Sequence, residues 1–431
     1  MKNKFNLLLI LCFHLFLILK SGYFLSPEFT LYPYLRDHGF LPYQNIIDQH
    51  LPIVLFGPIS LPSFLTTNPG NLLPLFLSVT LLVDLLFYLT LLRRKSPSSL
   101  LTLLLWVCLS FYFGGNTFWL ETFIVLCLAL ILFLSQSPRE WHKFFIGILA
   151  CFAFLIKPAI LPALLLLFLL LKIRPDRYLF LGFLIPLSLT ALYLFKFELF
   201  PSFYDLAFKF NKNQYLPQAG KLPNPRQLFE IGLLALLFIR RRFLATLTLA
   251  LFLAPAFPRF EYFHLQPALF LLAFLFVPKK RQTILILTSI LLVLSLTKVI
   301  LHSYGNFYLD ESSRLVAGYL SKNEANSVYI LGGNDLIYPL SGKIPPGETY
   351  LPSLPWYLGV DSYQNKVIAN LTIFFDTPVL VNYEASVDGQ NIARSAPRII
   401  KYIESNYTLQ DKVGGYDVFV RNFTAKGQSQ L

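Results

Sequence analysis

Long apolar runs, separated by short basic or polar segments, dominate the first 300 residues of the chain. A transmembrane helix needs about 20 apolar residues, and fewer where it is short or partly re-entrant. The stretch 53–66 is interrupted by prolines, so it is predicted to be a surface or re-entrant segment. The remaining runs predict about eleven membrane-spanning helices, near 6–25, 72–92, 99–113, 117–135, 144–156, 159–172, 178–195, 228–239, 243–257, 265–277 and 283–300.

The positions of Lys and Arg predict the orientation of these helices. Cytoplasmic loops carry an excess of basic residues, and the predicted spans place every basic cluster on one side of the membrane. We therefore expect a multi-pass protein of the cell membrane, with a cytoplasmic N-terminus and an uncleaved signal anchor as its first span. The clusters are Lys2 and Lys4, 93–95, Arg139 with Lys143, 172–177, 240–242 and 279–281.

Residues 301–431 have a different pattern. Runs of β-branched and aromatic residues at 327–332, 378–383 and 416–422 predict strands, and 311–322 and 391–405 are helix-like. The sequence thus predicts two domains: a transmembrane domain at 1–300, with a first external loop at 26–66, and a small extracytoplasmic α/β domain at 301–431.

Composition agrees with a polytopic α-helical membrane protein. Hydrophobic residues make up 55% and charged residues 14% of the chain, whereas soluble domains average about 25% charged residues. The net charge of +13 lies in the clusters at the ends of apolar runs, not on one folded face, which argues against nucleic-acid binding. All four cysteines fall within apolar runs and are expected to be buried and structural: Cys12, Cys108, Cys127 and Cys151.

Candidate functional residues gather at the predicted outer ends of the spans. Ionisable side chains at membrane depth are costly and are therefore functional candidates. Carboxylates beside cations on an aromatic-lined surface suit a lipid-linked anionic substrate. In the first external loop these are Glu28, Arg36, Asp37, His38, Asp48 and His50; in later outer turns they are Asn116, Glu121, Lys157, Arg259, Glu261, Tyr262, His264 and Gln266.

Several motifs follow in a recognisable order. The first external loop contains Glu28, Tyr32-Pro33, Gly39-Phe40-Leu41-Pro42-Tyr43 and Asp48-Gln49-His50-Leu51-Pro52; later come Lys157, the segment from Pro258 to Pro267, and the segment from Leu336 to Pro346. This order resembles the GT-C glycosyltransferases, in the branch of the protein O-mannosyltransferases and the aminoarabinose transferase for lipid A. Many of those proteins begin the loop with Asp or Asp-Glu, whereas this chain has Ser26-Pro27-Glu28. Glu28, Asp48 and Asp37 therefore all remain candidates for the base.

The resemblance implies transfer of a sugar from a polyprenyl-phosphate donor to a lipid, glycan or protein acceptor, with inversion. Glu28, or else Asp48, would deprotonate the acceptor hydroxyl. Lys157, Arg259 and His264 would bind the donor phosphate. The remaining candidates for substrate binding are Asp37, His50, Glu121, Glu261 and Tyr262. The sequence contains no Asp-x-Asp motif, so neither a metal nor another cofactor is predicted.

Two other functions remain open. A transporter or lipid-linked sugar flippase predicts inverted repeats and charged residues near midspan, whereas the candidate charges concentrate at one face and no repeat is evident. A catalytically inactive membrane scaffold is the other alternative. In that case Glu28 is a solvated loop acid, Asp48 caps a turn, Lys157 snorkels to the interface, and Arg259 forms an exposed ion pair with Glu261.

Overall fold

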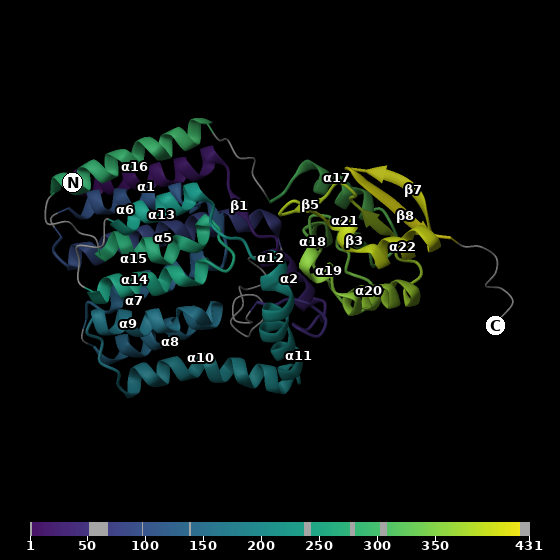
Figure 1. Ribbon diagram of the computed structural model, residues 1–431, viewed down its shortest axis with the longest axis horizontal. Coiled ribbons are helices and arrows are strands. Elements are labelled where there is room, and N and C mark those ends of the chain that lie inside the picture. The colour runs from purple at the N-terminus through teal and green to yellow at the C-terminus, as the bar shows by residue number, and fades with distance from the viewer. Residues whose placement is uncertain are drawn as a thin grey trace.

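The computed structural model describes residues 2–50, 68–96, 98–137, 139–236, 243–275, 281–301 and 308–422. The described chain is mostly helical. Figure 1 shows a bundle of helices on one side and the residues from 308 onward, with their strands, on the other. Both parts contribute side chains to one continuous hydrophobic core. The predicted surface or re-entrant segment at 53–66 lies outside the described residues.

Each stretch predicted as a membrane span contains a helix. The helices are α1 (Lys2–Ser21), α5 (Leu72–Arg93), α6 (Ser99–Tyr112), α7 (Leu120–Leu134), α8 (Glu140–Ile156), α9 (Leu161–Leu170), α10 (Arg177–Lys196), α13 (Pro225–Leu236), α14 (Phe243–Leu253), α15 (Gln266–Leu275) and α16 (Arg281–Leu301). By length and hydropathy, four of the described helices are able to cross a membrane: Lys4–Ser21, Pro69–Arg93, Arg177–Lys196 and Ile284–Leu301. These helices are compatible with a membrane location. The others are shorter: α6 has 14 residues and extends about 21 Å, against a hydrocarbon core of about 30 Å.

Two glycines let α8 and α10 approach each other closely. A Cβ atom added at Gly147 would lie 2.2 Å from the carbonyl oxygen of Leu179, and one added at Gly182 would lie 2.0 Å from that of Phe144. At each glycine the obstructing atoms belong to the backbone of the other helix, so the two helices would have to move apart to accept any larger residue. Small residues commonly permit this kind of contact between apolar helices.

The chain leaves α1 through a short strand and enters a helix outside the bundle. Strand β1 (Phe24–Leu25) pairs in parallel with β2 (Thr117–Phe118), in the turn between α6 and α7. Helix α2 (Glu28–Asp37) follows at once and, as Figure 1 shows, lies between the bundle and the C-terminal residues. The first loop is thereby attached to the α6–α7 turn at its start.

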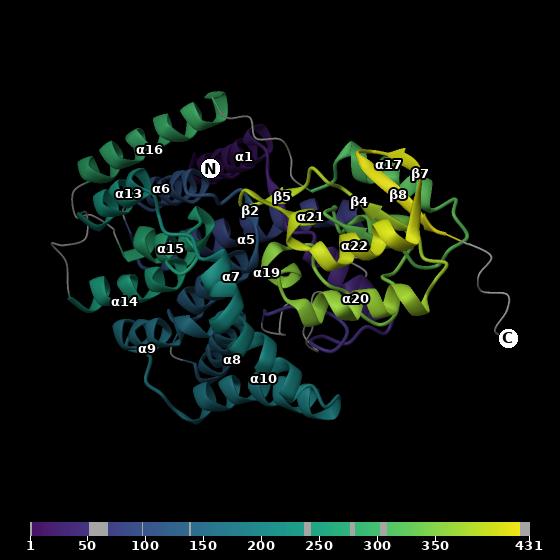
Figure 2. The ribbon, with the colours of Figure 1, turned by 45° about the vertical axis from the view of Figure 1, so that its right-hand side comes forward.

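The C-terminal residues form a mixed four-stranded sheet, of order β3-β4-β8-β7, with helices packed against it (Figure 2). Strand β3 (Tyr329–Leu331) is parallel to β4 (Val379–Val381), whereas β8 (Tyr416–Arg421) is antiparallel to both β4 and β7 (Tyr407–Val413). The helices are α17 (Glu311–Leu320), α18 (Ile337–Ser341), α19 (Pro355–Leu358), α20 (Asp361–Ile373), α21 (Ile392–Ser395) and α22 (Pro397–Asn406).

Strands β3, β4 and β8 lie in the three stretches predicted as strands, whereas β7 was not predicted. Most of the β7 side chains are exposed, so its sequence, YTLQDKV, lacks the apolar run of a buried strand. In the stretch predicted as a helix at 391–405, Ile392, Ile399 and Ile403 are buried. These three side chains fix which face of the segment points to the core.

The glycine contact predicts a specific loss of stability. Gly182→Ala should lower the free energy of unfolding by about 1–3 kcal/mol, because the added methyl group overpacks the α8–α10 contact. Gly232→Ala is the matched control, since it also lies in a helix but nothing lies within 4 Å of an added Cβ. The control should be neutral or stabilising. Thermal unfolding of the purified protein in detergent measures both, and equal midpoints would contradict the prediction.

Candidate functional site

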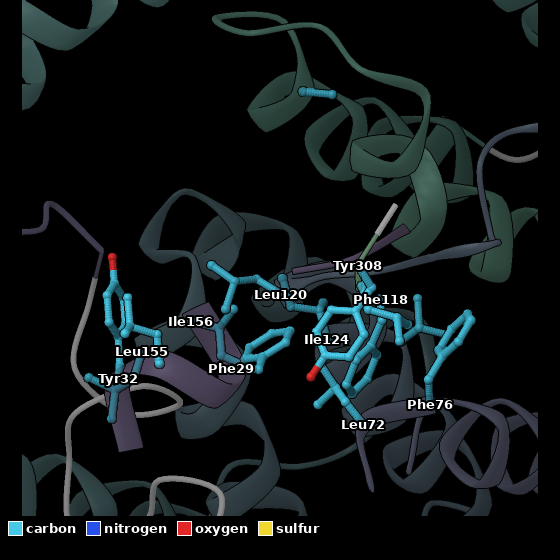
Figure 3. Close-up of a cluster of buried hydrophobic side chains, with 14 of the residues drawn as sticks. Phe29, Tyr32, Leu72, Phe76, Phe118, Leu120, Ile124, Leu155, Ile156 and Tyr308 are labelled. Carbon is cyan, nitrogen blue, oxygen red and sulfur yellow. The ribbon is translucent and has the colours of Figure 1, made fainter. Parts of the chain in front are cut away.

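Aromatic packing fixes the position of α2. The ring of Phe29, the second residue of the helix, lies 5.1 Å from that of Phe118 and 5.5 Å from that of Phe123. Figure 3 shows Phe29 among side chains of the bundle, including Phe76 and Ile124. Phe29 is fully buried. Because Glu28 immediately precedes it, the carboxyl group of Glu28 is held at the boundary between the bundle and the first loop.

Glu28 lies in a partly buried position at the start of α2. Its carboxylate accepts a hydrogen bond from the hydroxyl group of Ser26. Burial raises the pKa of Glu28 above its ordinary value; the charge of Asp48 raises it further, while the Ser26 hydrogen bond and the charge of His50 act in the opposite direction. Glu28 is therefore a stronger base, when ionised, than a solvated glutamate.

Asp48, which is buried, and His50, which is partly exposed, form a pair in the same site. Asp48 is 3% exposed, and its Oδ1 atom lies 2.8 Å from His50 Nδ1 and 2.7 Å from the His50 backbone nitrogen. The hydroxyl group of Tyr32, on α2, donates a hydrogen bond to the other oxygen. Asp48 therefore does more than cap a turn, because it also contacts the His50 side chain and the Tyr32 hydroxyl group.

These contacts shift both pKa values in the direction that favours an ion pair. Burial alone would raise the pKa of Asp48, but the charge of His50 and the hydrogen bonds from His50 and Tyr32 lower it overall. Burial alone would lower the pKa of His50, but the charge and hydrogen bond of Asp48 raise it, as do the charges of Glu28 and Glu121. Both shifts favour an imidazolium next to a carboxylate.

The C-terminal residues contribute a third acid to this site. Burial raises the pKa of Asp335 to about 7, and the charge of Glu28 adds to this shift. Asp335 lies between strand β3 and helix α18. Nearby, Tyr350 joins the first loop through its backbone: its nitrogen lies 2.7 Å from the oxygen of Asn45, and its oxygen lies 3.0 Å from the nitrogen of Ile47. Sequence reasoning missed Asp335, because a single acid in a loop carries no recognisable signal.

Glu121, Lys157 and His264 meet in a second cluster. Glu121, the second residue of α7, is 3% exposed, and its Oε1 atom lies 2.9 Å from Lys157 Nζ and 2.6 Å from His264 Nδ1. Lys157 directly follows α8, and His264 precedes α15. Two residues predicted to bind phosphate therefore come together around a carboxylate that was predicted to contact substrate.

The other predicted residues have different partners. Arg259 donates to Asp388 over 2.7 Å and lies over the ring of Trp356, so it does not pair with Glu261. Glu261 instead binds Lys221 over 2.7 Å, and the Tyr262 hydroxyl donates to Glu230 over 2.6 Å. Asp37 lies at the opposite end of α2 from Glu28, beside Arg36 at 3.5 Å and 42% exposed. The structure thus separates Asp37 from the Glu28 site.

A buried pair of ionisable side chains inside the bundle corrects the expectation that the costly polar residues lie at one face. Asp84, in the middle of α5, accepts from Trp106 Nε1 on α6 over 2.9 Å and lies 2.7 Å from Nδ1 of His14 on α1. Both carboxylate oxygens of Asp84 therefore have a partner, which makes its buried position tolerable. The sequence did contain a signal, a lone Asp in the apolar run LLVDLLF.

No protein-family model matches this chain, and no curated protein matches it significantly. Within the described residues, no three His, Cys, Asp or Glu side chains are grouped so that they could hold a metal ion.

The Asp48–His50 pair predicts a pH-dependent stability. The raised pKa of His50 stabilises the fold fully below its ordinary value of 6.5, and this contribution is lost as pH rises through the folded-state value. The lowered pKa of Asp48 stabilises the fold above its ordinary value of 3.8, and this contribution is lost as pH falls through the folded-state value. The difference in unfolding midpoint between wild type and His50→Gln should therefore be largest between about pH 4 and 6.5.

His38→Gln is the control for this measurement, because His38 also bonds within the first loop but to the carbonyl oxygen of Tyr34. The difference for His50→Gln should shrink in alkaline buffer. A difference for His50→Gln that stays constant from acidic to alkaline buffer would contradict the ion pair.

Proposed function

We propose that the chain is a membrane glycosyltransferase that moves a sugar from a polyprenyl-phosphate donor to an extracytoplasmic acceptor, with inversion. The observation that carries the proposal is that Glu28, the Asp48–His50 pair and Glu121 lie close enough for the charges of Glu28, Asp48 and Glu121 to act on His50. The eleven predicted crossings, the cytoplasmic N-terminus and an extracytoplasmic C-terminal domain belong to the same proposal.

Glu28 acts as the general base in this mechanism. It takes the proton of the acceptor hydroxyl while the oxygen attacks the anomeric carbon and the bond to the phosphate oxygen breaks. A raised pKa strengthens the base, and α2 fixes its position through Phe29. The ionised Asp48 is a poorer base, because His50 and Tyr32 already hold its charge.

The leaving lipid phosphate remains an anion and needs cations rather than a protonating acid. Lys157 and His264 provide charge-assisted donors. Glu121 already lies between these two side chains and orients them. Arg259 adds a further cation only after exchanging its partner Asp388 for phosphate.

A lipid-linked sugar flippase is the second candidate function. The observation that favours it is the His14–Asp84 pair in the middle of α1 and α5, since buried charges near midspan often mark transport pathways. A catalytically inactive scaffold is the remaining alternative. It is disfavoured by three ionisable groups of perturbed pKa in one site.

Substitution of Glu28 tests the proposed base. The purified protein is reconstituted in liposomes with a panel of polyprenyl-phosphate sugars and a membrane extract as acceptor, and mass spectrometry measures the released polyprenyl phosphate. Glu28→Gln should lower turnover by about 10²–10⁴-fold, because general-base catalysis is lost. Asp37→Asn is the matched control, and its turnover should stay unchanged.

Other outcomes separate the alternatives. Full activity of Glu28→Gln, Asp48→Asn and Lys157→Gln would overturn the site assignment. Absence of release by the wild type with every donor would overturn the transferase. In that case, movement of fluorescent lipid-linked sugar between leaflets would identify the protein as a flippase, and absence of such movement would favour the inactive scaffold.

The pH dependence of transfer gives an independent prediction. The base must be ionised to accept a proton, so kcat/KM should fall as pH drops through the pKa of Glu28. Because burial raises that pKa, the acidic limb should lie above the ordinary value of 4.5. The limb should disappear from the residual activity of Glu28→Gln, and an unchanged limb in that variant would assign the titration to another group.

A further inference from the structure

A small pocket with a volume of about 30 Å³ lies between helices of the bundle, and His14 and Asp84 contribute to its lining. Its lining comes from α1, α5, α6, β2, α7 and α15. Most of this lining is apolar, but it includes polar side chains of Thr80, Ser110 and Gln266. A buried water needs about 10–15 Å³ of such volume and two to four polar partners. The cavity therefore has the size and the chemistry for about two water molecules.

One atom of the lining lacks a partner. His14 is 1% exposed, its Nδ1 atom is taken by Asp84, and its Nε2 atom is buried with no hydrogen-bond partner among the described residues. A buried imidazole nitrogen without a partner is destabilising, because it has lost its hydrogen bond to water. Both protonation states of His14 require a partner there, since Nε2 either donates or accepts.

The other polar groups leave acceptor positions available to a small ligand. Thr80 donates to the carbonyl oxygen of Phe76 over 3.0 Å, and Ser110 donates to Gln266 Oε1 over 2.9 Å. Each hydroxyl oxygen retains lone pairs. Asp84 already accepts from both His14 and Trp106.

We propose that this cavity is a binding site for ordered water, which hydrogen-bonds to His14 Nε2 and completes the buried polar network of α1, α5 and α6. The ligand is a neutral donor and acceptor of hydrogen bonds no larger than water. The site is distinct from the Glu28 site and does not depend on sugar transfer.

Radiolytic labelling of the intact protein tests the proposal. Short X-ray exposure produces hydroxyl radicals from bound water, and these oxidise the aromatic side chains beside it. Phe76 and Phe87 are matched reporters, because both lie on α5 and both are 1% exposed, but only Phe76 lines the cavity. Phe76 should be oxidised at least about tenfold faster than Phe87, since a dry apolar environment supplies no radicals.

A variant without the polar network supplies the second measurement. The triple variant His14→Phe, Asp84→Leu and Trp106→Phe replaces the network with apolar groups, a change that proteins often tolerate. Oxidation of Phe76 should then fall to the rate of Phe87. Equal rates for the two residues in the wild type, or undiminished oxidation of Phe76 in the variant, would overturn the proposal. The wild-type comparison decides the matter even where the variant fails to fold.

Discussion

The pairing of buried charges is the constraint on which the arrangement of the helices depends. An isolated charge costs several kcal/mol when it leaves water, so each buried acid needs a partner on a neighbouring element. Asp84 joins α5 to α1 and α6, while Glu121 joins α7 to the end of α8 and the start of α15. Moving any one of these helices would break at least one of these contacts. Apolar packing brings the helices together, and these polar contacts select their register.

The candidate site also depends on paired ionisable groups, and these come from two regions far apart in sequence. Asp48 is held within the first loop and by Tyr32 of α2, and α2 rests on the bundle through Phe29. Asp335 approaches from the C-terminal residues. Burial raises the pKa of Glu28 in the first region and of Asp335 in the second, and the charge of Glu28 adds to the shift of Asp335.

The sequence predicted the positions of the helices well, because long apolar runs carry a strong signal. It also identified most of the residues of the candidate site, since few ionisable groups lie between the apolar runs. It did not predict partners: Arg259 pairs with Asp388, 129 positions away, instead of with Glu261. It also overlooked the His14–Asp84 pair, because each residue stands alone in its own apolar run, and only tertiary packing brings the two together.

The backbone pairing of Tyr350 with Asn45 and Ile47 has a consequence for biosynthesis. The partners are about 300 positions apart, and the ribosome makes the first loop long before its counterpart. Until Tyr350 has been synthesised, the backbone carbonyl group of Asn45 and the backbone amide group of Ile47 lack this partner. The candidate site is therefore completed late in translation. A chain that terminates before Tyr350 lacks the two hydrogen bonds that attach Asn45 and Ile47 to the C-terminal residues.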